Sequence, residues 1–422
     1  MTDPDVSPAP AHAASEPRGL GRRTSLHSWR FSALLASVSM IGPFAVDAYL
    51  PSFAAIGAEF EASPIAVQQT LSAYLFAFAF MMLWHGALSD AFGRRPVILG
   101  GLLVYSVASL GCAIAGNIES LWLFRTLQGL SAGSGVVVGR AIIRDRFEGP
   151  PAQQLMAQIT LVFGLAPALA PVIGGALLNL LGWRSIFWAM LTFSVAVLAW
   201  AARALPETLP RGQRQSLRPR VLWRNYRAVL LRRDFLLLAA IPTLNFAGFF
   251  TYISAAPAFL AKLGVTTWGF AWLFVPMIAG IMAGAAISGR VATYLPAHRT
   301  VAIGYVLMFV GALLELAVAS LVAPGVPWHV LPIAVFTLGS SLMMPSITLL
   351  LLDLFPTMRG LVSSLQGFMQ FSFSGVVAGT IAPLLAQTLA GLALGMLGFT
   401  LLSFALWGVC RRGAPDSKGF TG

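Results

Sequence analysis

The sequence predicts an all-α membrane protein with twelve transmembrane helices, arranged as two pseudo-symmetric six-helix bundles. Three observations predict this fold: the composition, the spacing of long apolar runs, and short motifs that recur in both halves. Hydrophobic residues make up 57% of the 422 residues and charged residues only 10%, whereas soluble domains have about 25% charged residues. The mean hydropathy is +0.80 and no long polar stretch interrupts the chain. A soluble domain with a single membrane anchor is therefore excluded.

Long apolar runs give the positions of the expected helices. A helix needs about 20 apolar residues to cross the hydrocarbon core of a bilayer, and runs of this length recur along the chain. The expected spans are 31–52, 67–88, 97–117, 121–141, 154–179, 184–205, 235–259, 268–290, 299–322, 329–352, 360–387 and 389–410. An even number of spans places both ends of the chain on the same side of the membrane.

Basic residues indicate which side that is. Nearly all of the 27 Lys and Arg residues fall in alternate loops, including eight arginines in the one long interior loop. Because cytoplasmic loops are enriched in Lys and Arg, we expect both termini and this loop to lie in the cytoplasm, with the protein integral to the bacterial cytoplasmic (inner) membrane. The expected regions are a disordered cytoplasmic tail at 1–30, six-helix bundles at 31–205 and 235–410, a cytoplasmic linker at 206–234 and a cytoplasmic tail at 411–422.

The same pattern argues against other classes of function. A net charge of +12 would suit a nucleic-acid partner, but charges spread over alternate loops form no binding patch. We therefore expect no nucleic acid and assign the loop arginines to topology and to contacts with anionic lipids. Cys112 and Cys410 are far apart, and the five histidines have no metal-ligand spacing. Since no nucleophile motif or nucleotide-binding loop is present, we expect no enzyme, no metal and no cofactor.

Short motifs recur about half a chain apart, which is typical of a duplicated six-span unit. The pairs are Pro51-Ser-Phe53 with Pro257-Ala-Phe259, Gly93-Arg94 with Gly289-Arg290, and Ala170-Pro171 with Ala382-Pro383.

The charged loop between the second and third spans carries the clearest motif. It runs from Gly86 to Pro96 as Gly-Ala-Leu-Ser-Asp-Ala-Phe-Gly-Arg-Arg-Pro, and it resembles the loop signature of the major facilitator superfamily. Asp47-Ala-Tyr-Leu-Pro51 and Arg140-Ala-Ile-Ile-Arg144-Asp145 resemble the Bcr/CflA subgroup of drug:proton antiporters. The likeness covers about residues 31 to 410. It implies two bundles around a central cavity, alternating access by rocking, and export of lipophilic compounds against an inward proton flow.

Two charged residues at matching depth in the first bundle are the candidate proton-coupling site. Asp47 lies near the outer end of the first span and Arg125 near the outer end of the fourth. A carboxylate at membrane depth is costly when it is charged and unpaired, so it binds a proton or meets a cation. We expect Asp47 to carry the proton and Arg125 to stabilise its ionised form in one conformation only. The alternative is a static ion pair that holds the two spans together.

The fourth and fifth spans carry further motifs. Arg125-x-x-Gln128-Gly129 resembles the superfamily's span 4 motif, which implies that Gln128 and Gly129 line or pack the same region. The fifth span contains Gly164, and it adds prolines that bend a helix and small residues that allow close helix approach. Its candidate gating residues are Pro167, Pro171, Gly174 and Gly175. The alternative is that these small residues only pack.

The Gly86–Pro96 loop and the inner end of the fourth span could form a cytoplasmic latch. Opposite charges there would pair when the inner side is closed and separate when it opens. The gating candidates are Gly86, Asp90, Gly93, Arg94, Arg95, Arg144 and Asp145. Asp90 could also lie against the positive N-terminal end of the eleventh span near Gly360. The alternative is that these charges only fix the topology.

Aromatic residues at helical spacing predict a lipophilic binding wall. The candidate substrate-binding residues are Met40, Phe44, Tyr49, Tyr74, Gln128, Asn245, Phe246, Phe249, Phe250 and Tyr252. Such residues also face lipid or pack internally, which is the alternative for each. Glu315 lies midway along the ninth span, where a charge facing lipid would be costly. We expect its side chain to be turned inward and either protonated or paired.

These observations favour a secondary active transporter that exports small lipophilic compounds, such as drugs or antibiotics, in exchange for protons. It is expected to act as a monomer among membrane lipids, with the proton gradient as its only energy source. One alternative is a transporter of a specific polar metabolite on the same fold, whose cavity should hold more polar and charged groups. The other is a non-transporting membrane sensor, against which the lack of a sizeable soluble domain stands.

Overall fold

The computed structural model describes residues 24–147, 155, 169–214, 217–265, 269–291, 294–355 and 358–413, and every regular element in these ranges is a helix. Ten helical segments are long and apolar enough to cross a membrane, and Leu169–Leu181 is a shorter apolar helix. The prediction of an all-helical membrane protein is confirmed. Two expected spans are not among the ten. The span at 121–141 lies within one helix, Ile118–Arg146, that is not counted among them, and most of the span at 154–179 lies outside the described residues.

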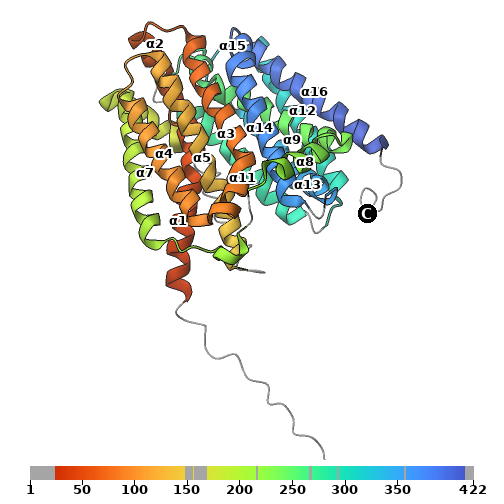
Figure 1. Ribbon diagram of the computed structural model, residues 1–422. Coiled ribbons are helices and arrows are strands. Elements are labelled where there is room, and N and C mark those ends of the chain that lie inside the picture. Colours follow the sequence, from red (N-terminus) through yellow and green to blue (C-terminus); the bar gives the residue numbers. More distant parts are fainter. Residues whose placement is uncertain are drawn as a thin grey trace, which may run out of the picture.

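The first half of the chain forms a group of antiparallel helices, shown in warm colours in Figure 1. They are α1 (Thr24–Asp47), η1 (Leu50–Ser52), α2 (Phe53–Glu59), α3 (Pro64–Phe92), α4 (Arg94–Ala113), α5 (Ile118–Arg146), Leu169–Leu181 and α7 (Arg184–Ala204). Polar caps begin two of them. The Ser63 hydroxyl accepts a hydrogen bond from the Ala66 amide, and Asn117 forms a capping box with Ser120.

The second half forms a similar group, shown from green to blue in Figure 1. It comprises α9 (Arg233–Ser254), α10 (Ala256–Lys262), α11 (Phe270–Val291), α12 (Ala297–Leu321), α13 (Leu331–Asp353), α14 (Arg359–Val376), the π-helical turn η4 (Val377–Ile381), α15 (Ala382–Leu385) and α16 (Leu389–Gly413). Together α14, η4 and α15 make one membrane-length segment. The π turn comes just before Pro383, whose missing N–H interrupts regular helical bonding.

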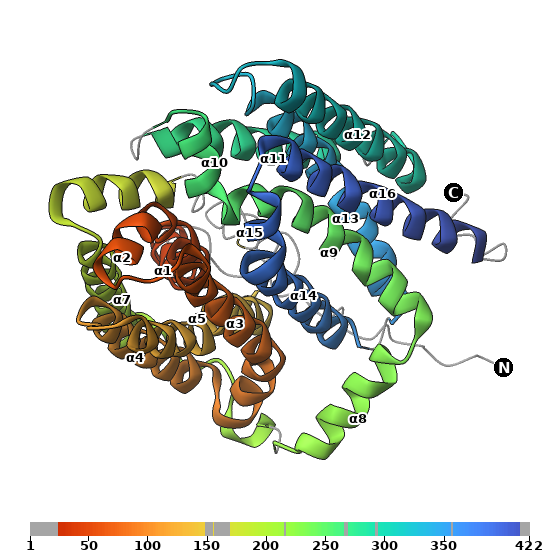
Figure 2. The ribbon, with the colours of Figure 1, turned by 90° about the horizontal axis from the view of Figure 1, so that it is seen from above.

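The two groups lie side by side, and α3 and α14 pack together between them, as seen from above in Figure 2. Close approach of these helices depends on small residues. A Cβ atom on Gly379 would lie 2.7 Å from the Ser72 hydroxyl oxygen, and one on Gly375 would lie 3.1 Å from the Phe76 ring. The two groups are therefore in contact through one helix from each half.

The helices differ from the predicted regions at both tails, and the linker is partly helical. Helix α1 begins at Thr24, inside the tail predicted at 1–30, because residues 24–30 contain no Gly or Pro that would end a helix; residues 1–23 lie outside the described part. The predicted linker at 206–234 contains η2 (Arg211–Gln213) and the 12-residue helix α8 (Pro219–Leu230). Arginines of α8 recur at helical spacing, a pattern that net charge alone does not reveal. Helix α16 continues to Gly413, inside the tail predicted at 411–422.

Candidate functional site

A central cavity of about 280 Å³ lies between the two halves. Its walls come from α1, α3, α9, α11, α13 and α14, so both groups of helices contribute. Apolar side chains predominate, and Asp47 is the single charged residue among the described residues that line it. Thr337, Ser340, Ser341 and Gln370 add a neutral polar strip on the side of the second half.

Aromatic rings cross the cavity from one half to the other. The ring of Phe371 on α14 lies edge-on to that of Phe78 on α3, with 4.7 Å between their centres. The centre of the Phe371 ring is also 6.4 Å from that of Phe246 on α9. Phe246 in turn contacts Phe249 and Phe250, at centre distances of 4.8 and 5.4 Å. These rings give the cavity a continuous apolar wall of edge-on, tilted and stacked contacts.

Part of this wall was predicted from the sequence. Tyr74, Phe246, Phe249 and Phe250 line the cavity as candidate substrate-binding residues should. Phe78 and Phe371 were missed, although each lies in an expected span that is rich in aromatic residues. Which face of such a helix points inward depends on packing against its neighbours, which the sequence alone does not specify.

The other six candidates are not among the described residues that line the cavity. Their surroundings explain this. Phe44 packs against the apolar core, and Met40 is half-buried. The Tyr49 hydroxyl is hydrogen-bonded to that of Thr70 at 2.7 Å, and the Asn245 amide nitrogen contacts the Met343 sulfur at 3.6 Å. Gln128 and Tyr252 are also buried; Gln128 contacts Arg125 and Tyr252 contacts Glu315.

Arg125 is fully buried in α5, beside the cavity but not on its wall. Its guanidinium carbon lies 4.5 Å from the centre of the Tyr49 ring and 4.4 Å from that of Tyr74, within range of cation–π attraction. Nη1 donates to the Ala45 carbonyl oxygen at 3.2 Å and to Gln128 Oε1 at 2.9 Å. Nε and Nη2 have no hydrogen-bond partner among the described residues. More than half of the guanidinium's N–H groups are therefore unused in this conformation.

Asp47 ends α1, is only 4% exposed, and lines the cavity. In the described part of the chain it forms no ion pair with Arg125, so the static pair considered as an alternative is absent from this conformation. Tyr74 connects the two residues. Its ring covers the guanidinium, it lines the same cavity as Asp47, and its hydroxyl donates to the Gly42 carbonyl at 2.9 Å.

The segment after Asp47 packs tightly against the Leu169–Leu181 helix. A Cβ atom on Gly174 would lie 2.8 Å from the Ala48 carbonyl carbon and would also meet the carbonyl oxygen. Pro171 and Gly175 are buried beside it. Pro167 and Gly164, the other candidates in this predicted span, lie outside the described residues. Gly129 of α5 makes a similar close approach to the Tyr74 backbone.

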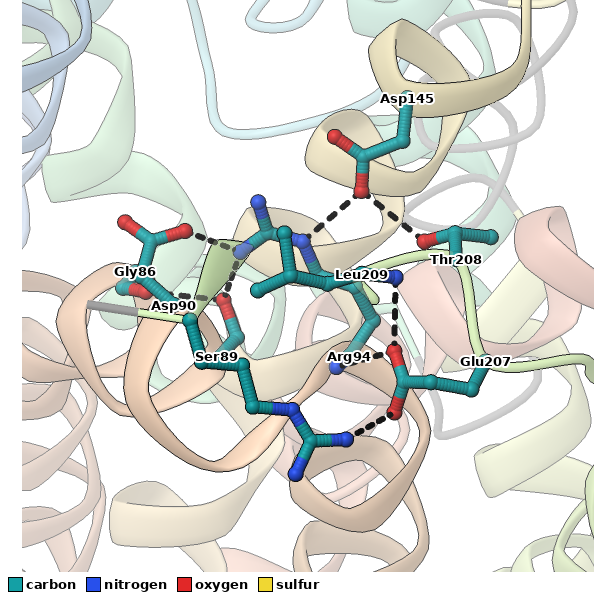
Figure 3. Close-up of polar contacts among 9 residues, drawn as sticks. Gly86, Ser89, Asp90, Arg94, Asp145, Glu207, Thr208 and Leu209 are labelled. Carbon is teal, nitrogen blue, oxygen red and sulfur yellow. Dashed lines mark hydrogen bonds and ion pairs between the residues drawn. The ribbon is translucent and has the colours of Figure 1, made fainter. Parts of the chain in front are cut away.

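A polar network surrounds Arg94 at the start of α4 (Figure 3). Nη1 pairs with Asp90 and donates to the Ser89 hydroxyl at 2.7 Å, while Nε donates to Asp145 Oδ2 at 2.9 Å. The guanidinium therefore joins the ends of α3, α4 and α5. Gly93, between α3 and α4, has φ +104°, a conformation that favours glycine.

Glu207 completes this network and was not predicted from the sequence. Its Oε1 accepts hydrogen bonds from the amides of Arg94 and Leu209, both at 3.0 Å, and its Oε2 lies 3.6 Å from Nη2 of Arg214 (Figure 3). The neighbouring Thr208 hydroxyl donates to Asp145 at 2.9 Å. The available signal was Pro206-Glu207-Thr208, a polar group directly after an apolar run. Nothing in the sequence connects that group to a loop more than a hundred residues earlier.

The other latch candidates are placed around this network. Arg95 donates to the Ala202 carbonyl at 2.7 Å, which ties α4 to α7 and not to the carboxylates. The Gly86 carbonyl accepts from the Ser89 hydroxyl at 2.8 Å. Arg144 lines a second cavity of about 540 Å³ together with Asp90 and Gly360, between α3, α5, α8 and α14. Asp90 and Gly360 thus line the same cavity, and no contact between them is described.

Helix α8 forms one wall of the second cavity. The Tyr226 hydroxyl donates to the Leu83 carbonyl of α3 at 2.6 Å, and burial raises the pKa of this phenol to about 12. This contact ties the interior linker to the first half of the chain.

Comparison with known proteins agrees with this geometry. Residues 35–379 match the sequence pattern of the family described as Major Facilitator Superfamily. A bicyclomycin resistance protein homolog of Haemophilus influenzae is 29% identical over 88% of this chain and 94% of its own length. Multidrug resistance protein MdtL of Escherichia fergusonii is 30% identical over 69% of this chain and 73% of its own.

Solved structures share the fold at low sequence identity. A D-xylose-proton symporter superposes with a TM-score of 0.75 at 15% identity, over 93% of this chain and 99% of its own. The human organic anion transporter MFSD10 has a TM-score of 0.66 at 17% identity, over 91% of this chain and 99% of its own. These two likenesses concern the fold alone.

Proposed function

We propose, from the premise that this chain belongs to the Major Facilitator Superfamily, that it exports small lipophilic compounds in exchange for protons. The predicted superfamily is confirmed, and relatives named for bicyclomycin and multidrug resistance agree with the drug:proton antiporter subgroup that its motifs resemble. The proposal includes twelve spans in two six-helix bundles, one in each half of the chain, with both termini and the linker between α7 and α9 in the cytoplasm of a bacterium.

The observation that carries the proposal is the chemistry of the central cavity. A wall of phenylalanine rings and aliphatic side chains suits flat lipophilic molecules of varied shape. Asp47 is the one ionisable acid among its described lining residues. A single acid in such a cavity attracts a lipophilic cation or a proton, so the two compete for one site. Competition of this kind is the minimum that coupled exchange requires.

Arg125 supports the coupling step. Its Nε and Nη2 groups are buried and unpaired among the described residues, which leaves donors available for a carboxylate in another conformation. When α1 shifts against α5 within the first half and brings Asp47 toward these donors, the ionised form is stabilised and the proton leaves. When they separate again, as here, Asp47 holds a proton or the substrate. The energy for export then comes from protons that enter from the outer side.

The Arg94 network supports the alternating-access part of the proposal. It connects the ends of α3, α4 and α5 with the segment after α7, at the end of the molecule where the second cavity lies. Such a network has two discrete arrangements, paired and separated, and can therefore bias which side of the transporter is open. Asp90, Arg94, Asp145 and Glu207 would pair when the cytoplasmic side is closed.

Transport by the purified full-length protein in proteoliposomes tests the proposal. Ethidium serves as the lipophilic-cation probe, and an imposed pH gradient is the driving force. We expect wild-type protein to move ethidium in the direction opposite to the proton flow, toward the more acidic side. A protonophore should abolish this movement. Asp47→Asn should lose the pH-driven movement, whereas Asp47→Glu, which keeps the carboxyl group, should retain part of it. Equal pH-driven transport by Asp47→Asn would rule out Asp47 as the proton site.

A polar-metabolite transporter is the second candidate, and the strip of Thr337, Ser340, Ser341 and Gln370 favours it. The strip is neutral and covers one side only, so it suits orientation of an amphipathic molecule as well as recognition of a metabolite. Competition decides between the two functions. If sugars or amino acids displace ethidium at lower concentration than lipophilic compounds do, the polar candidate replaces the export proposal.

A further inference from the structure

A second acidic side chain is buried in the other half of the molecule, away from the central cavity. Glu315 of α12 is fully buried. Its Oε1 accepts a hydrogen bond from the Tyr252 hydroxyl at 3.4 Å, and its Oε2 has no partner among the described residues. The coupling scheme of Asp47 and Arg125 makes no use of this group.

No cation neutralises Glu315 in the described part of the chain. The ionisable groups on the elements around it are Arg233, Asp234 and Tyr252 of α9, Lys262 of α10, His298, Arg299 and Tyr305 of α12 itself, His329 before α13, Asp353 at the end of α13, and Cys410, Arg411 and Arg412 of α16. Only Tyr252 has a described contact with the carboxyl group. The Nδ1 atom of His329 lies 3.0 Å from the Gly325 carbonyl oxygen, and Lys262 is exposed.

Burial without a counter-charge determines the protonation state. A carboxylate with one hydrogen bond and no cation is poorly solvated inside a membrane protein, whereas the neutral acid is tolerated. Glu315 therefore carries a proton while the Tyr252 hydroxyl of α9 is in contact with its carboxyl group, as it is here. If water enters between these helices, the acid can transfer that proton to water and remain as a hydrated carboxylate.

Helix α9 connects this acid to the substrate cavity. Tyr252 lies between Phe250 and Ile253, and both of those residues line the cavity. A tilt of α9 that opens the cavity to one side would move the Tyr252 hydroxyl relative to Glu315 on α12. The same motion would therefore change the substrate site and the surroundings of the buried acid.

We propose that Glu315 is a second proton-binding site, which holds its proton in this conformation and releases it to water when α9 and α12 separate during transport. The inference rests on the proposed proton-coupled export. With Asp47 and Glu315 both carrying protons, two protons enter for each molecule exported. Exchange of two protons for one singly charged cation moves net charge, so the membrane potential drives it. With Asp47 alone, one proton exchanges for one cation and no net charge moves.

Potential-driven transport separates these stoichiometries. Full-length protein in proteoliposomes is given ethidium and a potassium–valinomycin potential without a pH gradient, and a parallel sample is given a pH gradient without a potential. Wild type should respond to both driving forces. Glu315→Gln should lose the response to potential and keep the response to the pH gradient. An unchanged potential response in Glu315→Gln, or a wild type that responds only to the pH gradient, would overturn the inference.

The same data distinguish failure of the underlying function. If wild-type protein responds to neither gradient, proton-coupled export itself is wrong, whatever Glu315 does. Glu315→Asp keeps a carboxyl group and should keep the potential response, and Tyr252→Phe should do the same because it removes only the hydrogen bond. Ethidium binding at wild-type affinity shows that Glu315→Gln is folded.

Infrared spectroscopy gives a readout that does not depend on transport. In the Asp47→Asn background at neutral pH, the carbonyl stretch of a protonated carboxylic acid should be present. It should shift in the Asp47→Asn/Glu315→Asp double variant, which keeps the acid in a different position. Absence of a protonated-acid band in the Asp47→Asn protein would mean that Glu315 is ionised and would overturn the inference.

Discussion

The Tyr74 ring lies against the guanidinium of Arg125, with 4.4 Å between the ring centre and the guanidinium carbon, and its hydroxyl donates to the Gly42 carbonyl of α1. One tyrosine of α3 thus holds the buried cation of α5 and the helix that ends in Asp47. The relationship explains how an arginine with two donor atoms that lack partners among the described residues stays in the protein interior. Attraction to two rings replaces part of the missing solvation.

Replacement of this arginine by lysine should destabilise the protein. Arg125→Lys keeps the charge but loses the planar group between Tyr49 and Tyr74 and the bond to Gln128. We expect the free energy of unfolding in detergent to fall by about 2 kcal/mol. Tyr74→Phe keeps the ring and loses only the hydrogen bond to Gly42, so it should cost about 1 kcal/mol. Equal stability of Arg125→Lys and wild type would show that stacking contributes nothing.

Removal of the ring that bridges the two halves should weaken binding of lipophilic probes. Phe371→Ala loses the contacts with Phe78 and Phe246, and aromatic pairs contribute about 0.5–1.5 kcal/mol each. Ethidium affinity, measured by fluorescence anisotropy, should fall by about tenfold. Phe373→Ala is the matched control on the same helix, because Phe373 packs on Phe399 and is not among the described cavity-lining residues. Similar losses in both variants would refute a role of the Phe371 ring in the cavity.

Glu207 should affect which side of the transporter is open. Glu207→Gln weakens its bond to the Arg94 amide and its ion pair with Arg214, which is partly exposed and contributes about 0.2–1 kcal/mol. Distances between spin labels on α3 and α14 should shift toward a population open at the Arg94 end. Glu59→Gln is the control, since Glu59 pairs with Arg184 at the opposite end of the helices. The latch hypothesis fails if the two variants give the same distance distribution as wild type.

Sequence patterns predicted the helices better than the site. Apolar runs of membrane length are a local property, so most spans were predicted. Asp47, Tyr74 and Phe246 do line the cavity, because the position of a residue along its span and the spacing of aromatic residues are both visible in the sequence. Gln128 was expected to line or pack the region of Arg125, and it does accept a hydrogen bond from Arg125, but it is not among the described residues that line the cavity. Its neighbours come from other helices, and their rotation about the helix axis is set by packing.

Long-range polar contacts were the least predictable feature. The charged loop at residues 86–96 was recognised, and Arg94 does contact Asp90 and Asp145. Glu207 and Thr208 could not be assigned to the same network, because only the folded chain brings the end of α7 beside the start of α4. Helix α8 was not predicted for a different reason. The many arginines of the linker indicated a cytoplasmic loop, although those within α8 recur at helical spacing.

Docking of α8 should weaken at high pH. The pKa of Tyr226 is raised from 10.0 to about 12 by burial, so the neutral phenol favours the docked state. Its contribution is fully present below pH 10 and is lost as the pH rises through about 12. Proteolysis of the linker in the detergent-solubilised protein should therefore accelerate over this range. Tyr226→Phe removes the ionisable group and the bond to Leu83, so the variant should be cleaved faster at neutral pH and show a smaller increase.

Replacement by alanine should have opposite effects at Gly93, which precedes α4, and at Gly100, which lies inside α4. Gly93 has φ +104°, and a Cβ atom there would lie 2.8 Å from Nη2 of Arg214 and would also meet Glu207. Gly93→Ala should therefore lower the free energy of unfolding by about 1–3 kcal/mol, from backbone strain and displaced charges. Gly100, in the interior of α4, has open space where a Cβ atom would be added, so Gly100→Ala should raise helix stability by about 0.5–1 kcal/mol. Denaturant unfolding in detergent measures both, and equal effects would show that the Gly93 turn is not strained by a side chain.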